Sequence, residues 1–213
     1  LEDLSLDVLE GQLTVIVGPN ACGKSTLLRS LARVLGVRSG VVELDGRALT
    51  TMNQKELARR LGLLAQSSTA PADILVEDLV ARGRYPHQSL LRQWSAGDDE
   101  AVAWAMRQAG VEALARRRVG ELSGGQRQRV WIAMVLAQST DIVLLDEPTT
   151  YLDLNHQLEV LRLARRLQAD GRTIVAVLHD LHLAFRYATH LVCMKEGRTV
   201  AQGAPSDIVT PAL

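Results

Sequence analysis

Cysteines, aromatic residues and net charge are all scarce in this sequence. The two cysteines, Cys22 and Cys193, are too few for a disulfide framework and do not form a metal-ligand cluster. Aromatic residues make up only 3% of the chain, which argues against a surface that stacks single-stranded bases. Because 24 basic residues balance 24 acidic ones, no overall field favours nucleic acid or anionic lipid. We therefore expect no nucleic-acid partner.

Long hydrophobic runs are also missing. No apolar run approaches the roughly 18 to 20 residues of a membrane-spanning helix, and the N-terminus does not resemble a signal peptide. We therefore expect an intracellular chain, and any membrane that it serves must be spanned by another protein. The sequence begins without Met, in residues that already lead into a strand. This start predicts a trimmed domain.

The apolar content is sufficient for one sizeable domain, since 47% of the 213 residues are hydrophobic. Short β-branched runs alternate with helical patterns, which predicts an α/β fold with a mainly parallel sheet covered on its faces. The predicted strands cover residues 13–17, 41–44, 61–65, 142–145, 173–178 and 190–194. The predicted helices cover residues 25–35, 56–60, 74–81, 98–109, 112–117, 125–137, 155–169 and 180–187. The strand at 41–44 leads into an Asp-Gly hairpin turn, which predicts an antiparallel portion near the N-terminus.

Strand patterns disappear in the middle of the sequence, where helical stretches follow one another. We predict a single domain over residues 1–213, with a core formed by about 1–70 and 125–213. The segment at about 71–124 is predicted to be a helical insert in this core.

A glycine-rich loop between a predicted strand and a predicted helix matches the pattern G-x-x-x-x-G-K-[ST]. Such a loop lets backbone N–H groups surround phosphate oxygens, and the following helix N-terminus favours their negative charge. Lys24 would reach the β- and γ-phosphates, and the Ser25 hydroxyl would bind Mg²⁺. The loop therefore predicts an ATP and Mg²⁺ site. Its predicted nucleotide contacts are Gly18, Pro19, Asn20, Ala21, Cys22, Gly23, Lys24, Ser25 and Thr26.

Two carboxylates follow the apolar strand at 142–145. Ligand sites of parallel sheets form at this carboxyl end of the strands. Asp146 suits a contact to Mg²⁺ through water, and Glu147 is placed to polarise an attacking water. Many buried strands end in acids, so this pair gains its significance from the phosphate loop that accompanies it.

Residues 122–126 read Leu-Ser-Gly-Gly-Gln and open a helix with a hydroxyl and two glycines. Ser123 would serve as an ordinary N-cap, yet this helix start is also a second anion-binding terminus. One domain has little use for two separate γ-phosphate cradles. We therefore predict that each cradle serves a nucleotide shared with a second copy of the chain. The predicted contacts are Ser123, Gly124, Gly125 and Gln126.

These motifs, in this order, resemble the nucleotide-binding domain of ABC transporters, and the resemblance covers essentially the whole chain. It implies the P-loop ATPase fold of that family. We also predict that two copies meet head to tail in a homodimer, or that the chain pairs with another ATPase subunit. The resemblance also implies roles for three further sites. Gln66 matches the glutamine that senses Mg²⁺ and the attacking water and touches the membrane partner. Asp153 matches the loop that crosses the dimer interface, and His179 matches the histidine that contacts the γ-phosphate. Lys24, Gln66, Glu147 and His179 are thus the expected catalytic residues, with Ser25, Gln66 and Asp146 at the metal.

A narrower resemblance points to the importer ATPases for ferric siderophores. It is carried by residues 82–88 (Arg-Gly-Arg-Tyr-Pro-His-Gln), 151–157 (Tyr-Leu-Asp-Leu-Asn-His-Gln) and 200–205 (Val-Ala-Gln-Gly-Ala-Pro). Relatives in that group carry vitamin B12 or haem. The group implies separate permease subunits, an extracytoplasmic binding protein, and a peripheral position on the cytoplasmic face of the plasma membrane.

The sequence departs from the family pattern at a few places. The aromatic residue that stacks on adenine would lie upstream of the first residue, and the usual C-terminal segment would lie beyond Leu213. Ala21 stands where many members have glycine, and Tyr151 where many have a small residue, although an aromatic there fits the siderophore group.

Other classes of protein fit less well. Soluble ABC proteins of translation usually carry two cassettes in one chain, and those of DNA repair carry a long coiled coil that this sequence does not show. Exporter subunits are normally fused to a spanning domain. A purely structural module is disfavoured because Glu147 and His179 are both present. An ATPase of a vitamin B12 or haem importer is the nearest alternative, followed by a soluble ABC ATPase outside transport.

Overall fold

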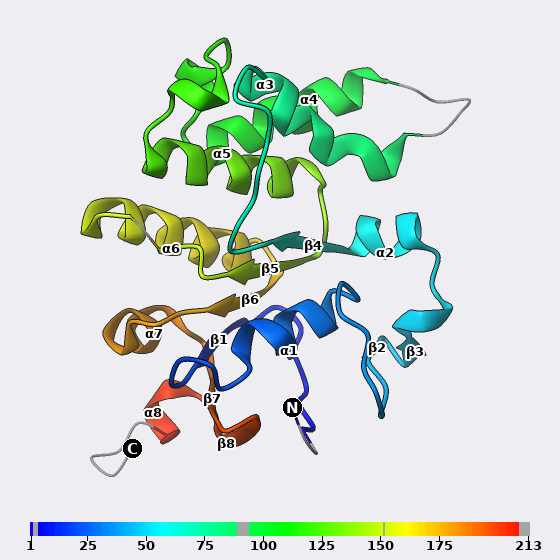
Figure 1. Ribbon diagram of the computed structural model, residues 1–213, viewed down its shortest axis with the longest axis vertical. Coiled ribbons are helices and arrows are strands. Elements are labelled where there is room, and N and C mark those ends of the chain that lie inside the picture. Colours follow the sequence, from blue (N-terminus) through cyan, green and yellow to red (C-terminus); the bar gives the residue numbers. More distant parts are fainter. Residues whose placement is uncertain (2–3, 89–93, 151, 209–213) are drawn as a thin grey trace.

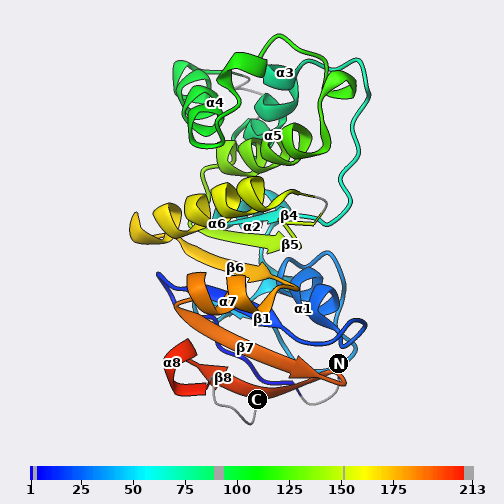
Figure 2. The same cartoon turned by 90° about the vertical axis from the view of Figure 1, so that its left-hand side faces the viewer.

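The computed structural model describes residues 1, 4–88, 94–150 and 152–208. A six-stranded sheet runs through the molecule in the order β4-β5-β6-β1-β7-β8 (Figures 1 and 2). Its strands are β1 (Leu13–Val17), β4 (Leu61–Leu64), β5 (Ile142–Asp146), β6 (Thr173–Val177), β7 (His190–Lys195) and β8 (Arg198–Gly203). All pairs are parallel except β7 with β8. This confirms the predicted α/β class with a mainly parallel sheet.

The helices cover the sheet on both faces and form a separate layer at one end. They are α1 (Lys24–Leu31), α2 (Gln54–Arg60), α3 (Val76–Ala81), α4 (Ala96–Gln108), α5 (Gly124–Ala137), α6 (Leu154–Ala169), α7 (Leu181–Tyr187) and α8 (Pro205–Ile208). Short 3₁₀ helices are η1 (Leu49–Thr51), η2 (Arg82–His87), η3 (Glu112–Leu114) and η4 (Val119–Glu121). A hairpin of β2 (Glu43–Leu44) and β3 (Arg47–Ala48) stands apart from the main sheet.

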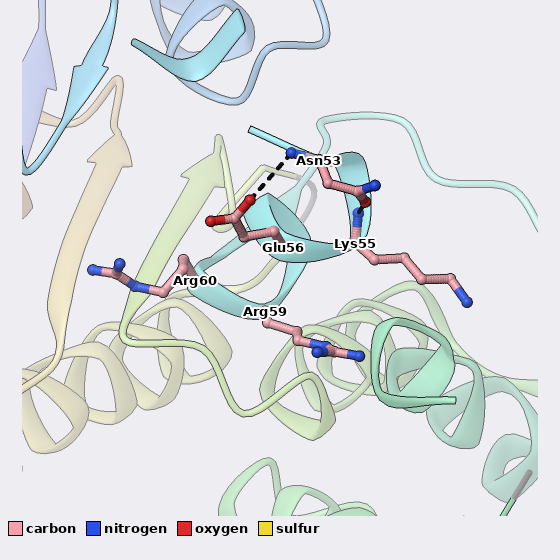
Figure 3. A pocket seen from close by; sticks show the side chains of 5 residues that line it. All are labelled: Asn53, Lys55, Glu56, Arg59 and Arg60. Carbon is pink, nitrogen blue, oxygen red and sulfur yellow. Dashed lines mark hydrogen bonds between the residues drawn. The ribbon is translucent and has the colours of Figure 1, made fainter. Parts of the chain in front are cut away.

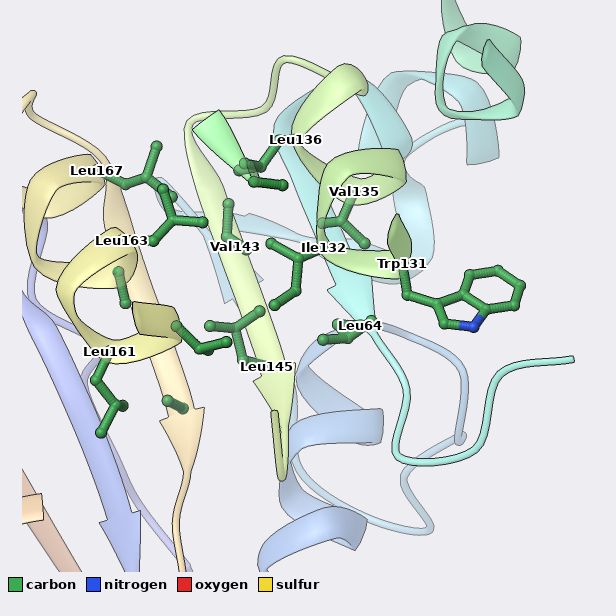
Figure 4. Close-up of a cluster of buried hydrophobic side chains, with 14 of the residues drawn as sticks. Leu64, Trp131, Ile132, Val135, Leu136, Val143, Leu145, Leu161, Leu163 and Leu167 are labelled. Carbon is green, nitrogen blue, oxygen red and sulfur yellow. The ribbon is translucent and has the colours of Figure 1, made fainter. Parts of the chain in front are cut away.

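Side chains that alternate along the buried strands point to opposite faces of the sheet, and each face is covered by different helices. On β1, Val15 and Val17 join the cluster that contains α5, α6 and α7 residues, whereas Ile16 joins the cluster that contains Leu27 and Leu28 of α1. Figure 4 shows the first cluster, where α5 and α6 place aliphatic side chains over β5. Every residue of β1 and β6 is buried, as expected for strands covered on both faces.

The described part of the middle segment is helical, and α5 joins it to the sheet. Side chains of α3, α4 and α5 share one core, and the three helices lie together in Figure 1. The same α5 also contacts β4. The exact division into core and insert stays a prediction. Among the described residues, no helix has the length and apolar character needed to cross a bilayer.

Several predicted elements differ from the structure at their ends. The predicted helix at 25–35 ends at Leu31, because Arg33 adopts a left-handed backbone (φ 54°) and the N–H groups of Val34 and Leu35 turn back to the carbonyl of Arg29. The predicted helix at 112–117 is only the 3₁₀ turn η3, since the chain then extends and Arg118 pairs with Leu75.

Two strands need correction. The strand predicted at 41–44 shrinks to the two residues of β2, although its Asp45-Gly46 turn has positive φ at both positions, as the hairpin prediction required. The antiparallel edge strand β8 was not predicted. Its alternation of exposed and half-buried residues is short and polar, which makes the signal weak.

Candidate nucleotide site

The predicted catalytic residues lie at the carboxyl ends of four neighbouring strands. The glycine-rich loop follows β1, His179 follows β6, Asp146 ends β5, and Gln66 follows β4. Because β1, β6, β5 and β4 are consecutive neighbours and parallel, their carboxyl ends meet at one edge of the sheet. The fold therefore gathers residues from four separate motifs along a single edge.

Backbone conformation at the loop requires glycine at two positions. Gly18 has φ 152°, and a Cβ on it would lie 2.1 Å from the carbonyl oxygen of Met194 in β7. Gly23 caps α1 with φ 102°. The loop thus runs directly against the neighbouring strand before it enters the helix. Ala21, at the position where many family members have glycine, also has a positive φ of 61°.

Replacing Gly18 by alanine is expected to weaken ATP binding by about tenfold or more, because the loop must move away from Met194. Titration with a fluorescent ATP analogue measures this. The matched control is Gly36→Ala, where an added Cβ meets nothing within 4 Å. Equal affinities for the two variants would show that the close approach at Gly18 is unimportant for the loop.

Lys24 closes the loop from inside. Its ammonium donates to the carbonyls of Gly18 (2.9 Å) and Pro19 (2.8 Å), and its side chain is buried. An ammonium has three N–H donors, and the third contact is only a 4.0 Å approach to the sulfur of Cys22. A phosphate oxygen can replace this weak partner without breaking the two carbonyl contacts.

Asp146 and Ser25 form an oxygen-rich pair suited to a hard cation. The Ser25 hydroxyl donates to Oδ1 of Asp146 at 2.8 Å, while Oδ2 is buried without a hydrogen-bond partner in the described part of the chain. Arg29 lies 3.5 Å from Oδ2 and supplies the nearest positive charge. Carboxylate and hydroxyl oxygens with nucleotide phosphates are the ligands that Mg²⁺ prefers. Within the described residues, no group of three or more His, Cys, Asp or Glu side chains could hold a metal alone.

Glu147 is the point where side chains from three strand ends converge. Its Oε2 accepts hydrogen bonds from Gln66 Nε2 (2.8 Å) and Thr150 Oγ1 (3.1 Å). Its Oε1 lies 2.6 Å from His179 Nε2. The backbone of Glu147 is left-handed, with φ 53°, so the chain turns sharply as the strand ends. Sequence reasoning identified three of these four residues and missed Thr150.

These contacts control the charge of the carboxylate. Burial disfavours the charged form of Glu147 and raises its pKa. The hydrogen bond and the charge of His179, and the hydrogen bonds from Thr150 and Gln66, have the opposite effect. They outweigh burial and hold the pKa of Glu147 below its usual value. Glu147 therefore stays ionised down to a lower pH than an ordinary glutamate. An ionised carboxylate can orient and polarise a water molecule.

The second predicted anion-binding terminus lies elsewhere in the chain. Ser123 caps α5 in a reciprocal box, with its Oγ accepting from Gln126 N (3.3 Å) and its N–H donating to Gln126 Oε1 (3.1 Å). A Cβ on Gly125 would contact Leu152 at 3.5 Å. In Figure 1, α5 and α1 lie on opposite sides of β5 and β6. The two predicted cradles are therefore not parts of one local pocket.

Asp153, the predicted interface residue, caps α6. Its carboxylate accepts from the backbone N–H of His156 (3.0 Å) and lies 2.9 Å from the ring Nδ1 of the same residue. These hydrogen bonds hold the pKa of Asp153 below its usual value. The same histidine approaches Gly125, so the 123–126 segment and the Asp153 loop lie side by side. Tyr151, which carried part of the narrower resemblance, lies outside the described residues.

Known proteins match this chain over essentially all of its residues. The ferric enterobactin transport ATP-binding protein FepC of Escherichia coli (strain K12) is 55% identical over 213 residues, covering 100% of this chain and 79% of FepC. YusV of Bacillus subtilis (strain 168), which is named "Probable siderophore transport system ATP-binding protein", is 53% identical, covering 99% of this chain and 77% of YusV. The hemin import ATP-binding protein HmuV of Rhodococcus jostii (strain RHA1) is 44% identical, covering 100% and 72%.

A solved structure and a family description agree with these relatives. The dimeric post-hydrolysis structure of the ATP-binding cassette MJ0796 with ADP and phosphate superposes with a TM-score of 0.85 at 26% identity, over 96% of this chain and 90% of that one. The family described as ABC transporter matches residues 1–150. This chain therefore belongs to the ABC transporter family, as an ATPase that hydrolyses ATP to drive transport.

Proposed function

We propose that this chain energises the import of ferric siderophores, hydrolysing ATP at two sites shared between two copies arranged head to tail. The observation that carries the catalytic part is the convergence of Gln66, Thr150 and His179 on Glu147, beside the Asp146–Ser25 pair. The similarity to FepC and YusV supports the cargo, since both are named for siderophore systems.

In this proposal each nucleotide binds between the 18–26 loop of one copy and residues 123–126 of the other. The separation of the two cradles within one chain supports such an arrangement, as does the dimeric MJ0796 cassette. Asp153 stands beside the 123–126 segment and would lie at the same interface. ATP, with the charge of its γ-phosphate, would hold the two copies together, and its loss would release them.

The hydrolytic step needs little covalent work from the protein. A water oxygen attacks the γ-phosphorus, the bond to the β–γ bridging oxygen breaks, and ADP and phosphate leave. Glu147 orients the water and accepts its proton, and Lys24 neutralises phosphate charge. Ser25 and Asp146 would hold Mg²⁺, with Gln66 beside it, and the ion would supply further positive charge to the phosphates.

His179 cannot donate its Nε2 proton to Glu147 and to a phosphate at the same time. The 2.6 Å contact to Glu147 is therefore exchanged for a γ-phosphate contact when ATP is bound. This exchange frees Oε1 of Glu147 for the water. Nucleotide binding and activation of the carboxylate are thus one event.

The membrane partner is proposed to be a permease that receives substrate from an extracytoplasmic binding protein. The chain would dock on the cytoplasmic face of the plasma membrane, through Gln66 and the region around residues 82–88. Tyr85 there is 65% exposed, as a docking residue must be. The cargo is recognised by the partners, so the chain itself needs no iron ligands.

Uptake in cells of the source organism tests the cargo. With the native gene replaced by the Glu147→Gln form, uptake of labelled ferric siderophore should be lost, while vitamin B12 and haem uptake stay normal. Restoration by the unaltered gene is the control. Normal siderophore uptake in cells without a second such ATPase would refute the cargo. Loss of haem uptake instead would favour the haem importer suggested by the similarity to HmuV.

A further inference from the structure

The 3₁₀ helix η2 is packed tightly on the C-terminal end of α5. A Cβ on Gly83 would lie 2.1 Å from the carbonyl oxygen of Met134, so the two backbones are in direct contact. His87 Nε2 lies 2.8 Å from the carbonyl oxygen of Gln138, just after the helix. With no room between them, η2 and the end of α5 must move together.

Arg84 is the centre of this contact, and it is buried. Its Nη1 donates to the last helical carbonyl of α5, that of Ala137 (2.7 Å), and to the hydroxyl of Ser139 (3.0 Å). Its Nε donates to Asp98 Oδ1 at 2.8 Å. Ser139 has a left-handed backbone with φ 56°, a conformation that a non-glycine residue keeps only where neighbours hold it. Arg84 is one of those neighbours.

The charges of this buried pair match the two helix ends that they join. Asp98 lies in the first turn of α4, where a negative charge is favoured, and Arg84 lies at the end of α5, where a positive charge is favoured. Exposure of the two residues is only 2% and 7%. Burial opposes the charge of Asp98, but hydrogen bonds from Ser95 and Arg84 outweigh it and keep its pKa below the usual value. Asp98 is therefore ionised near neutral pH.

On its other side η2 is held by α2. Figure 3 shows a hollow on α2 in which Lys55 and Arg59 point to the same side, away from Arg60. Lys55 donates to the carbonyl of Gln88 and Arg59 to that of Pro86, both at 2.9 Å. The fixed segment is thus continuous from α2 through η2 to α5.

The opposite end of α5 is the capped Ser123. A helix of 14 residues spans about 20 Å and transmits a shift at one end to the other. We propose that Arg84 is a positioning residue for ATP hydrolysis, because it fixes the C-terminal end of α5 and thereby sets where Ser123 meets the nucleotide of the second copy. This inference rests on the shared sites proposed above.

The test measures two equilibria in the Glu147→Gln background. Arg84→Met with Asp98→Asn removes both buried charges, so that neither is left unpaired. A fluorescent ATP analogue titrated into dilute protein gives the affinity of the monomer, and light scattering across protein concentrations gives the ATP-dependent dimer. We expect an unchanged monomer affinity, within about threefold, and a dimer weakened about 100-fold by a misplaced Ser123. Arg107→Met, at an exposed arginine of α4 outside the proposed docking region, is the control and should leave both equilibria unchanged.

Each other outcome has a definite meaning. Unchanged dimerisation of the double variant would overturn the role of Arg84. A loss of monomer affinity for ATP as large as the loss of dimerisation would overturn it too, since the defect would then lie in the 18–26 loop of the same chain. Failure of the Glu147→Gln parent to dimerise would overturn the shared sites themselves, and the inference with them. If the double variant does not fold, Arg84→Lys decides by the same two titrations. It keeps the charge but lacks the fork that reaches Asp98 and Ala137 together, and must also weaken the dimer.

Discussion

Replacing Glu147 by glutamine should lower ATP turnover by about 10²–10⁴-fold while ATP binding persists. Glutamine has the size of glutamate but neither its charge nor its ability to accept hydrogen bonds on both sides. Positioned donors from Gln66, Thr150 and His179 would then face a group that cannot accept a proton from water. The residues proposed to contact the phosphates are unchanged. ATP should therefore accumulate at the site and trap the dimer.

Turnover is measured by phosphate release, and the dimer by light scattering with Mg-ATP at high protein concentration. The control is Glu159→Gln, which removes a half-exposed carboxylate paired with Arg129 on the surface. Full ATP turnover in the Glu147→Gln variant would show that Glu147 has no part in catalysis. A variant that binds ATP but stays monomeric would instead contradict the shared sites.

The Lys24→Ala variant should lose ATP-dependent stabilisation almost completely. Lys24 is buried and donates to two loop carbonyls, so its loss would remove the proposed phosphate contact and also loosen the loop. ATP at 100 times its dissociation constant stabilises the original chain by about 2.7 kcal/mol, which is several degrees in melting temperature. The same ATP concentration should shift the variant by little or nothing.

Thermal unfolding with and without Mg-ATP measures this effect. The variant without nucleotide should also be less stable, by about 1–3 kcal/mol, because two carbonyls lose their donor. Lys195→Ala, at an exposed position at the end of β7, serves as the control. An ordinary ATP-induced shift in the Lys24 variant would show that the loop binds phosphate through its backbone alone.

The parts of the site that sequence reasoning predicted are those fixed by local pattern. The glycine loop, the acidic strand end and the capped helix each combine a turn, a buried run and a polar residue within a short stretch of sequence. The glycine loop and the acidic strand end lie at the same edge because β1 and β5 belong to one run of parallel strands. Residues placed by tertiary contacts were not predicted: Thr150 reads as an ordinary loop threonine until the left-handed turn at Glu147 brings it back.

The Arg84–Asp98 pair shows why the remaining contacts could not be predicted from the sequence. The two residues are 14 positions apart on different helices, and each reads alone as a solvated charge. Their burial depends on α5, which neither residue belongs to. The early end of α1 has the same origin, because Arg33 donates to the carbonyls of Leu49 and Met52 instead of continuing the helix.

The order of the strands has a consequence for which nucleotides the site can distinguish. Neighbouring strands are about 4.8 Å apart. The carboxyl ends of β1, β6, β5 and β4 therefore lie at nearly equal spacings along one edge of the sheet. With ATP bound as proposed above, a phosphate chain anchored at the β1 loop would extend toward Glu147, which follows β5, two strands away. A diphosphate would end before the groups that a triphosphate reaches. The order of the strands would therefore let the site distinguish ATP from ADP by the length of the phosphate chain.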